Sequence, residues 1–131
     1  MPRENLEAII VHHAATTPRM KVNADVIDQW HRQRGWLAIG YHWVILRDGS
    51  IQPGRLSNQV GAHAGPAWNS RSIAICLAGG LDEKTRETVD NFTDEQYRSL
   101  SAICMAYGDL PVKLHKDVAE TECSAIDLSR I

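Results

Sequence analysis

The chain has 131 residues and a formal net charge of −2 at pH 7. This length suits a single domain that buries its own core without disulfides. The small negative charge gives no positive field that would concentrate the protein on nucleic acid or on an anionic membrane, so we expect neither as a partner. At the amino terminus, acidic residues precede any apolar stretch, and no run approaches the length of a spanning helix. We therefore expect synthesis in a cytoplasm, without a signal peptide.

The first half of the chain predicts a strand, a helix and a hairpin. Residues 8–13 are apolar and β-branched, as in a strand buried on both faces, and they end in two histidines. Asn23 is a suitable N-cap for a helix from Ala24 to Arg34, and Gly35 follows its end. The predicted hairpin consists of a strand, a tight turn and a return strand at residues 41–47, Asp48-Gly49 and 50–52.

The second half predicts a buried strand, a charged loop, a helix and a short strand. The strand at 72–77 ends before two glycines, and the charged residues after it indicate a surface loop at 81–91. Thr93 and Gln96 form a capping box that opens a helix, and 112–115 is the last predicted strand. This alternation predicts an α/β fold, one domain over residues 1–131, with helices covering a central sheet.

Three residues that could together bind zinc are far apart in the sequence. His12 lies at the end of the first predicted strand, and Cys123 follows His115 by eight positions in a polar segment. Two imidazoles and a thiolate fill three tetrahedral positions and leave the fourth for water, as in a catalytic zinc site. By residue type alone, three dispersed ligands in a chain with six histidines could be a coincidence, and His12 a strand-end histidine bonded to backbone.

Seven short motifs follow one another along the chain: IVHHAAT at 10–16, WHRQRGW at 30–36, GYHWVI at 40–45, RDG at 47–49, VGAHA at 60–64, NSRSI at 69–73, and the segment 115–123. In order and spacing they resemble the motifs of type-2 N-acetylmuramoyl-L-alanine amidases. The resemblance covers nearly the whole chain. It is strongest for the small bacteriophage amidase lysozymes and more distant for animal peptidoglycan recognition proteins.

The resemblance implies a mixed-sheet fold with Zn²⁺ in a surface cleft, held by His12, His115 and Cys123. It implies cleavage of the amide between the lactyl group of N-acetylmuramic acid and L-alanine of the peptide stem. Zinc in such a site lowers the pKa of its bound water to about 7 and polarises the scissile carbonyl. The expected partner is peptidoglycan, and we expect a monomer that acts on the bacterial cell wall after release or delivery.

Two further residues have catalytic roles by resemblance. Tyr41 supplies a phenolic hydroxyl to the oxyanion that forms during attack. Thr121 stands where phage members of the family carry lysine, and recognition proteins with amidase activity resemble this chain in having threonine there. We therefore expect Thr121 to donate a neutral hydrogen bond. A second departure is Ser124, where the family usually has proline directly after the cysteine.

The predicted substrate-binding residues are His63, Trp68 and Asn69. Small residues flank His63, which favours a place in the cleft wall over a solvated loop histidine. Trp68, beside Asn69, fits a platform for a sugar or peptide stem and a loop-packing residue equally well. His13 and His42 are interpreted as structural histidines or as supports for the ligands.

Two alternative functions remain open. One is a module that binds peptidoglycan without cutting it, although such members of the family typically lack the cysteine ligand that Cys123 represents. The other is an antibacterial effector amidase delivered to a rival cell.

Overall fold

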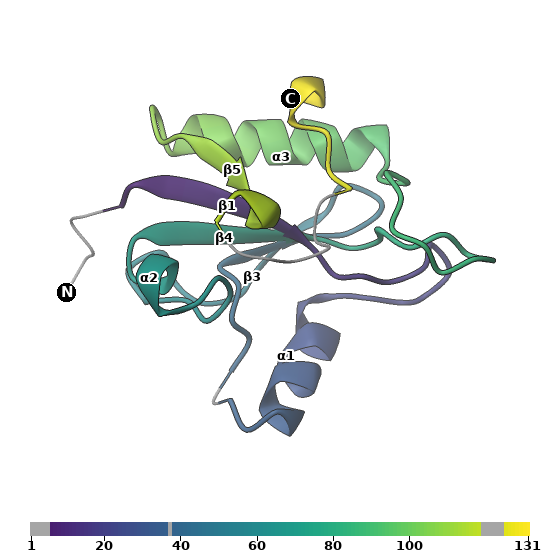
Figure 1. Ribbon diagram of the computed structural model, residues 1–131, viewed down its shortest axis with the longest axis horizontal. Coiled ribbons are helices and arrows are strands. Elements are labelled where there is room, and N and C mark those ends of the chain that lie inside the picture. Colours follow the sequence, from purple (N-terminus) through teal and green to yellow (C-terminus); the bar gives the residue numbers. More distant parts are fainter. Residues whose placement is uncertain (1–5, 37, 119–124) are drawn as a thin grey trace.

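A mixed β-sheet lies between helices in the computed structural model, which describes residues 6–36, 38–118 and 125–131 (Figure 1). The five strands have the order β3-β2-β4-β1-β5. Only β2 and β3 pair antiparallel, while the other pairs are parallel. Helix α3 covers one face of the sheet, and α1 and α2 lie on the other side (Figure 1). The elements are β1 (Ala8–His13), α1 (Ala24–Gln33), β2 (Trp43–Ile45), β3 (Ile51–Pro53), α2 (Pro66–Asn69), β4 (Ser72–Leu77), α3 (Asp94–Ala106) and β5 (Val112–Leu114). The predicted α/β class is confirmed.

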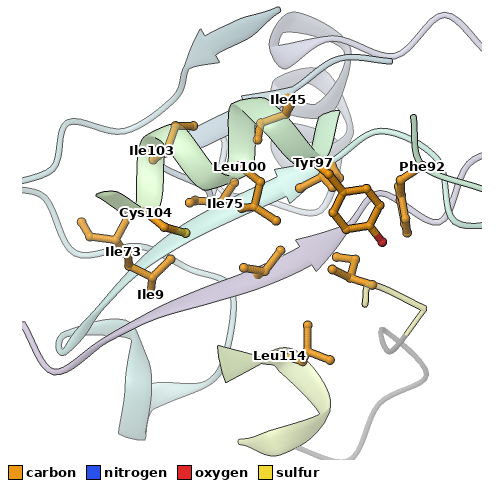
Figure 2. Packing of buried hydrophobic residues seen from close by; sticks show 13 residues of the cluster. Ile9, Ile45, Ile73, Ile75, Phe92, Tyr97, Leu100, Ile103, Cys104 and Leu114 are labelled. Carbon is orange, nitrogen blue, oxygen red and sulfur yellow. The ribbon is translucent and has the colours of Figure 1, made fainter. Parts of the chain in front are cut away.

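The main core lies between α3 and the sheet (Figure 2). Every residue of β1 and β4 is buried, and alternate side chains of these strands, such as Ile9, Val11 and Ile75, pack against α3. The helix contributes side chains at helical spacing, as predicted: Tyr97, Leu100, Ile103 and Cys104. The opposite face of the sheet packs partly on α1, through Ile27, Val44 and Cys76. His12, the candidate zinc ligand in β1, is on that second face, since it alternates with Val11.

Most differences from the predicted elements occur at their ends. β1 and β4 have the predicted bounds, and Asn23 caps α1 by accepting from the Val26 amide. The first hairpin strand is shorter than the predicted 41–47, because ladder pairing covers only three residues on each side, and the return strand begins and ends one residue later than predicted, at Ile51–Pro53. His115 is not in the last strand but begins a short 3-10 turn. Helix α2 was not predicted, since its four residues are too few to show a periodicity.

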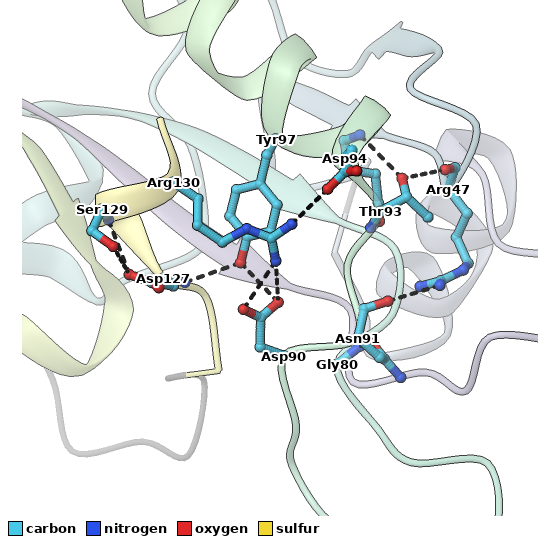
Figure 3. A network of polar contacts seen from close by, with 11 residues as sticks. Arg47, Gly80, Asp90, Asn91, Thr93, Asp94, Tyr97, Asp127, Ser129 and Arg130 are labelled. Carbon is cyan, nitrogen blue, oxygen red and sulfur yellow. Dashed lines mark hydrogen bonds and ion pairs between the residues drawn. The ribbon is translucent and has the colours of Figure 1, made fainter.

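A network of polar contacts fixes the carboxyl-terminal residues 125–131 to α3 (Figure 3). The Tyr97 hydroxyl donates to Asp90 and accepts from the Asp127 amide. Arg130 lies over the Tyr97 ring, 3.9 Å from its centroid, and pairs with Asp90 and Asp94. Burial raises the pKa of Tyr97 to about 12, so its hydroxyl remains a donor at neutral pH. Residues 125–131 are therefore anchored to the core. Among the described helices, none is long and apolar enough to cross a membrane.

Gln96 is a buried polar residue that joins α3 to the sheet. Its side-chain amide donates to the carbonyls of Ile45 and Ala78, at 3.2 and 2.8 Å, and its oxygen accepts from the Thr93 amide. The same pair of residues forms the predicted capping box. All three backbone groups would lose this partner if the amide were removed.

We expect Gln96→Leu to lower the free energy of unfolding by about 3 kcal/mol, because each buried polar group left without a partner costs about 1–3 kcal/mol. Urea denaturation measures the change. The matched control is Gln29→Leu, which makes the same replacement at an exposed position of α1. Equal losses in the two variants would show that the buried hydrogen bonds of Gln96 contribute nothing.

Candidate active site

Strand register brings His12 and His115 together. β1 and β5 run parallel with Val11 opposite Leu114, so the residues that follow these two, His12 in β1 and His115 directly after β5, lie at the same edge of the sheet. The ring centroids of His12 and His115 are 4.3 Å apart. His12 lies on the sheet face away from α3, whereas His13 points to the other side, with its ring 6.0 Å from Phe92. Strand alternation thus places only the first histidine of the pair at the site.

Both site histidines are held in the neutral form. Burial, with neighbouring His63, His115 and His13, holds the pKa of His12 well below its ordinary value. Burial also lowers the pKa of His115. A neutral imidazole is the form that binds a metal ion. The ring pair therefore offers nitrogen donors suited to zinc, which binds imidazole and thiolate.

The third predicted ligand, Cys123, and the second predicted donor, Thr121, lie outside the described residues. Within residues 6–36, 38–118 and 125–131, no three His, Cys, Asp or Glu side chains form a metal-binding group. The described part of the site therefore contains two of the three predicted ligands. Cys76 and Cys104 are both buried, in keeping with their apolar segments.

Tyr41 lies two residues before β2 and belongs to the same cluster. Its ring centroid is 5.2 Å from that of His12 and 5.4 Å from that of His31 on α1. His31 Nδ1 accepts a hydrogen bond from the Gly40 amide at 2.8 Å, which fixes the segment that carries Tyr41. A small cavity of about 60 Å³ adjoins the Tyr41 ring and is lined also by Trp30 and Arg34 of this region.

His63 contacts the site through His12. The two residues meet with His12 Nε2 and His63 Nδ1 2.9 Å apart, and His63 Nε2 lies 3.2 Å from the hydroxyl of Ser72. Asn69 fixes the loop, since its side-chain oxygen accepts from the amides of both His63 and Ala64. A Cβ at Gly61 would lie 2.7 Å from the His63 ring, so the small neighbour gives this ring its room. Ser72 is the site residue that sequence reasoning missed.

Trp68 packs within its own loop. The guanidinium of Arg71 lies over its ring, 4.2 Å from the centroid, so one ring face is covered. Its carbonyl accepts from the Ser72 hydroxyl at 2.8 Å. This geometry supports the loop-packing interpretation of Trp68, and a contact with substrate stays a prediction.

The other two histidines are structural. His42 is fully buried, with Nδ1 accepting from the Ala74 amide and Nε2 2.7 Å from the Gln59 carbonyl. His13 Nδ1 accepts from the Ala15 amide. Both rings therefore bond to backbone, as one of the two sequence interpretations expected.

The buried His31 predicts a pH dependence of stability. Burial and neighbouring Arg34 and Arg55 lower the pKa of His31 from 6.5 to about 4 in the folded protein. The unfolded chain then binds more protons between these values, so the free energy of unfolding falls as the pH drops from 6.5 to about 4. We expect a shallower dependence in His31→Asn, which keeps an acceptor near Gly40. Urea denaturation over this pH range measures both slopes, and parallel slopes would contradict the assignment.

Comparison with known proteins identifies the family. The model of the N-acetylmuramoyl-L-alanine amidase family matches residues 2–125. The endolysin of Enterobacteria phage T3 is 41% identical over 133 residues, covering 98% of this chain and 87% of the phage protein. Among solved structures, the amidase LysC from Clostridium intestinale URNW is 35% identical with a TM-score of 0.73, over 93% of this chain and 78% of that one. A Drosophila PGRP-LB mutant in complex with tracheal cytotoxin is 26% identical with a TM-score of 0.68, over 95% of this chain and 82% of that one. This chain belongs to the N-acetylmuramoyl-L-alanine amidase family.

Proposed function

We propose that this protein is a zinc-dependent amidase that cleaves the bond between the lactyl group of N-acetylmuramic acid and L-alanine in peptidoglycan, and that it serves as a phage endolysin. Membership of the amidase family and the similarity to the T3 endolysin support the activity and the role. The observation that carries the proposal is the convergence of His12, His115 and Tyr41 from three separate segments on one edge of the sheet. The protein would be made in the cytoplasm and act on the wall after release.

The proposed zinc ligands are His12, His115 and Cys123. Zinc in this site would supply an activated water and polarise the scissile carbonyl. Tyr41 is the proposed donor to the oxyanion, because its ring lies beside that of His12 and a hydrogen-bond donor held near developing charge stabilises the transition state. Thr121 is proposed as a second, neutral donor.

The proposed substrate is a muramyl-peptide, bound along the wall that His63 forms. The PGRP-LB relative in complex with tracheal cytotoxin supports this class of ligand. His63 contacts His12 directly, so the wall that it would form lies beside a proposed zinc ligand. Asn69 would act mainly through the loop, since its side-chain oxygen already accepts two backbone amides. Trp68 would offer the ring face that Arg71 leaves uncovered.

Mass spectrometry of digested cell-wall sacculi tests this function against the binding-module alternative. An amidase releases peptides with a new amino terminus at L-alanine and leaves a free lactyl carboxylate on the glycan. A binding module sediments with the sacculi and releases nothing. His12→Ala serves as the control, because it should abolish release while leaving the preparation otherwise the same. Products cut elsewhere, or no products, would refute the proposal.

Thr121 should contribute modestly to catalysis. A neutral hydrogen bond to the oxyanion is about half as strong as one from a cation. We expect Thr121→Ala to lower kcat/KM by roughly tenfold, about 1.4 kcal/mol, without loss of zinc. Thr121→Lys should keep or raise activity. Steady-state cleavage of a defined muramyl-peptide measures both, and normal turnover by Thr121→Ala would remove this residue from the mechanism.

A further inference from the structure

We infer that Ser72 is a positioning residue, which acts through His63 to fix the ring of His12 so that its Nδ1 is the atom presented to the metal. This inference rests on the proposed zinc site, but the hydrogen bonds that carry it belong entirely to described residues. Ser72 and His12 are both buried, at 0% and 1% exposure, so the contacts lie away from competing water.

Hydrogen bonds link His12, His63, Ser72 and the Trp68 carbonyl in series. The carbonyl at the end of this series determines the direction of each hydrogen bond. The Trp68 carbonyl can only accept, so the single hydrogen of the Ser72 hydroxyl points to it. The Ser72 oxygen must then accept in its contact with His63 Nε2, which therefore carries a hydrogen. In a neutral His63 ring, Nδ1 is left with a lone pair and accepts from His12 Nε2. The hydrogen of His12 is thus on Nε2, and its Nδ1 keeps a lone pair.

Hydrogen bonds fix the backbone of His63 as well as its ring. The amides of His63 and Ala64 both donate to Asn69, each at 3.0 Å, and the Ser72 hydroxyl lies in β4, next to β1 in the sheet. The rings of His63 and His12 are therefore oriented before a metal ion binds. Groups that hold the second nitrogen of a metal-binding histidine typically change metal affinity by about 10–100-fold when they are removed.

Isosteric replacements separate this role from a merely structural one. The side-chain oxygen of asparagine can occupy the position of Nδ1 in histidine, so His63→Asn keeps an acceptor for His12. His63→Leu removes it at similar volume. Ser72→Ala removes the group that sets the His63 tautomer. The matched control is Ser99→Ala, which also deletes a serine hydroxyl bonded to a carbonyl, that of Gly49 at 2.6 Å, but on α3 away from the site.

Nitrogen-15 NMR of the imidazoles in metal-free protein reads the tautomer directly, and calorimetric zinc titration of the same samples gives the affinity. We expect His12 to carry its hydrogen on Nε2 in the wild type, in Ser99→Ala and in His63→Asn. In Ser72→Ala and His63→Leu we expect mixed tautomers and zinc affinity about tenfold weaker or more. His63→Asn should bind zinc within about threefold of the wild type.

A hydrogen on His12 Nδ1 in the wild type would overturn the inference, and so would a Ser72→Ala variant whose zinc affinity equals that of Ser99→Ala. Neither result would contradict the proposed amidase activity, which requires only that the protein binds zinc. Conversely, a wild type that binds no zinc would refute the proposed function. The tautomer spectra would still show whether the hydrogen bonds from Ser72 to His12 have the inferred directions.

Discussion

Cys123→Ser should remove zinc and amidase activity together. A serine hydroxyl stays protonated at neutral pH and is a poorer ligand for zinc than a thiolate, so two imidazoles alone would have to hold the metal. Without the metal, the activated water and the polarisation of the carbonyl are both lost. We expect little zinc after gel filtration and a fall in kcat/KM of more than about 10³-fold. Metal analysis and muramyl-peptide hydrolysis on one sample measure the two effects.

The control for this variant is Cys104→Ser, the same replacement in α3. Burial raises the pKa of the Cys104 thiol to about 11, so this cysteine stays a thiol and offers no thiolate at neutral pH. It should keep its zinc and its activity even if it loses some stability. Full zinc occupancy and full turnover in Cys123→Ser would show that the ligand assignment is wrong.

Tyr41→Phe should keep zinc and fold but lower kcat by about 10²–10³-fold, with little change in KM. The hydroxyl acts mainly on charge that develops during attack, so its loss affects the transition state more than the bound substrate. Steady-state kinetics on a defined muramyl-peptide separates the two parameters.

Tyr107→Phe is the matched control for Tyr41→Phe. Its hydroxyl bonds to the indole of Trp43 and to Ser57, outside the cluster around His12. That variant should lose some stability without a change in kcat. An unchanged kcat in Tyr41→Phe would remove this tyrosine from the mechanism and leave the oxyanion to other groups.

The sequence predicted most of the elements but not their arrangement, and it missed α2. Residues 8–13 and 72–77 read as buried strands because both are unbroken apolar runs, and both have the predicted bounds. The order of strands in the sheet depends on long-range pairing, which leaves no local pattern. Only the register of Val11 with Leu114 explains why His12 and His115 meet. From the sequence, their proximity was predicted by the resemblance to the family and not by their spacing.

The role of Ser72 at the site could not be predicted from the sequence. It reads as the first residue of a buried strand, and although it belongs to the NSRSI motif at 69–73, its residue type alone does not assign it to a site. Its contact with His63 arises from the packing of the 61–70 loop against β4, through Asn69 and the Trp68 carbonyl. Trp68 and Asn69 contribute to holding this loop, and their contact with substrate stays a prediction.

Stepwise addition of zinc to metal-free protein, with amidase activity assayed at each step, tests the central claim most directly. The account predicts that metal-free protein is inactive and that activity rises in proportion to bound zinc, levelling off at one ion per chain, because His12, His115 and Cys123 form one site. His12→Ala, titrated in parallel, should show neither binding nor activity. Full hydrolysis of the lactyl–L-alanine bond by the metal-free wild type would contradict the account.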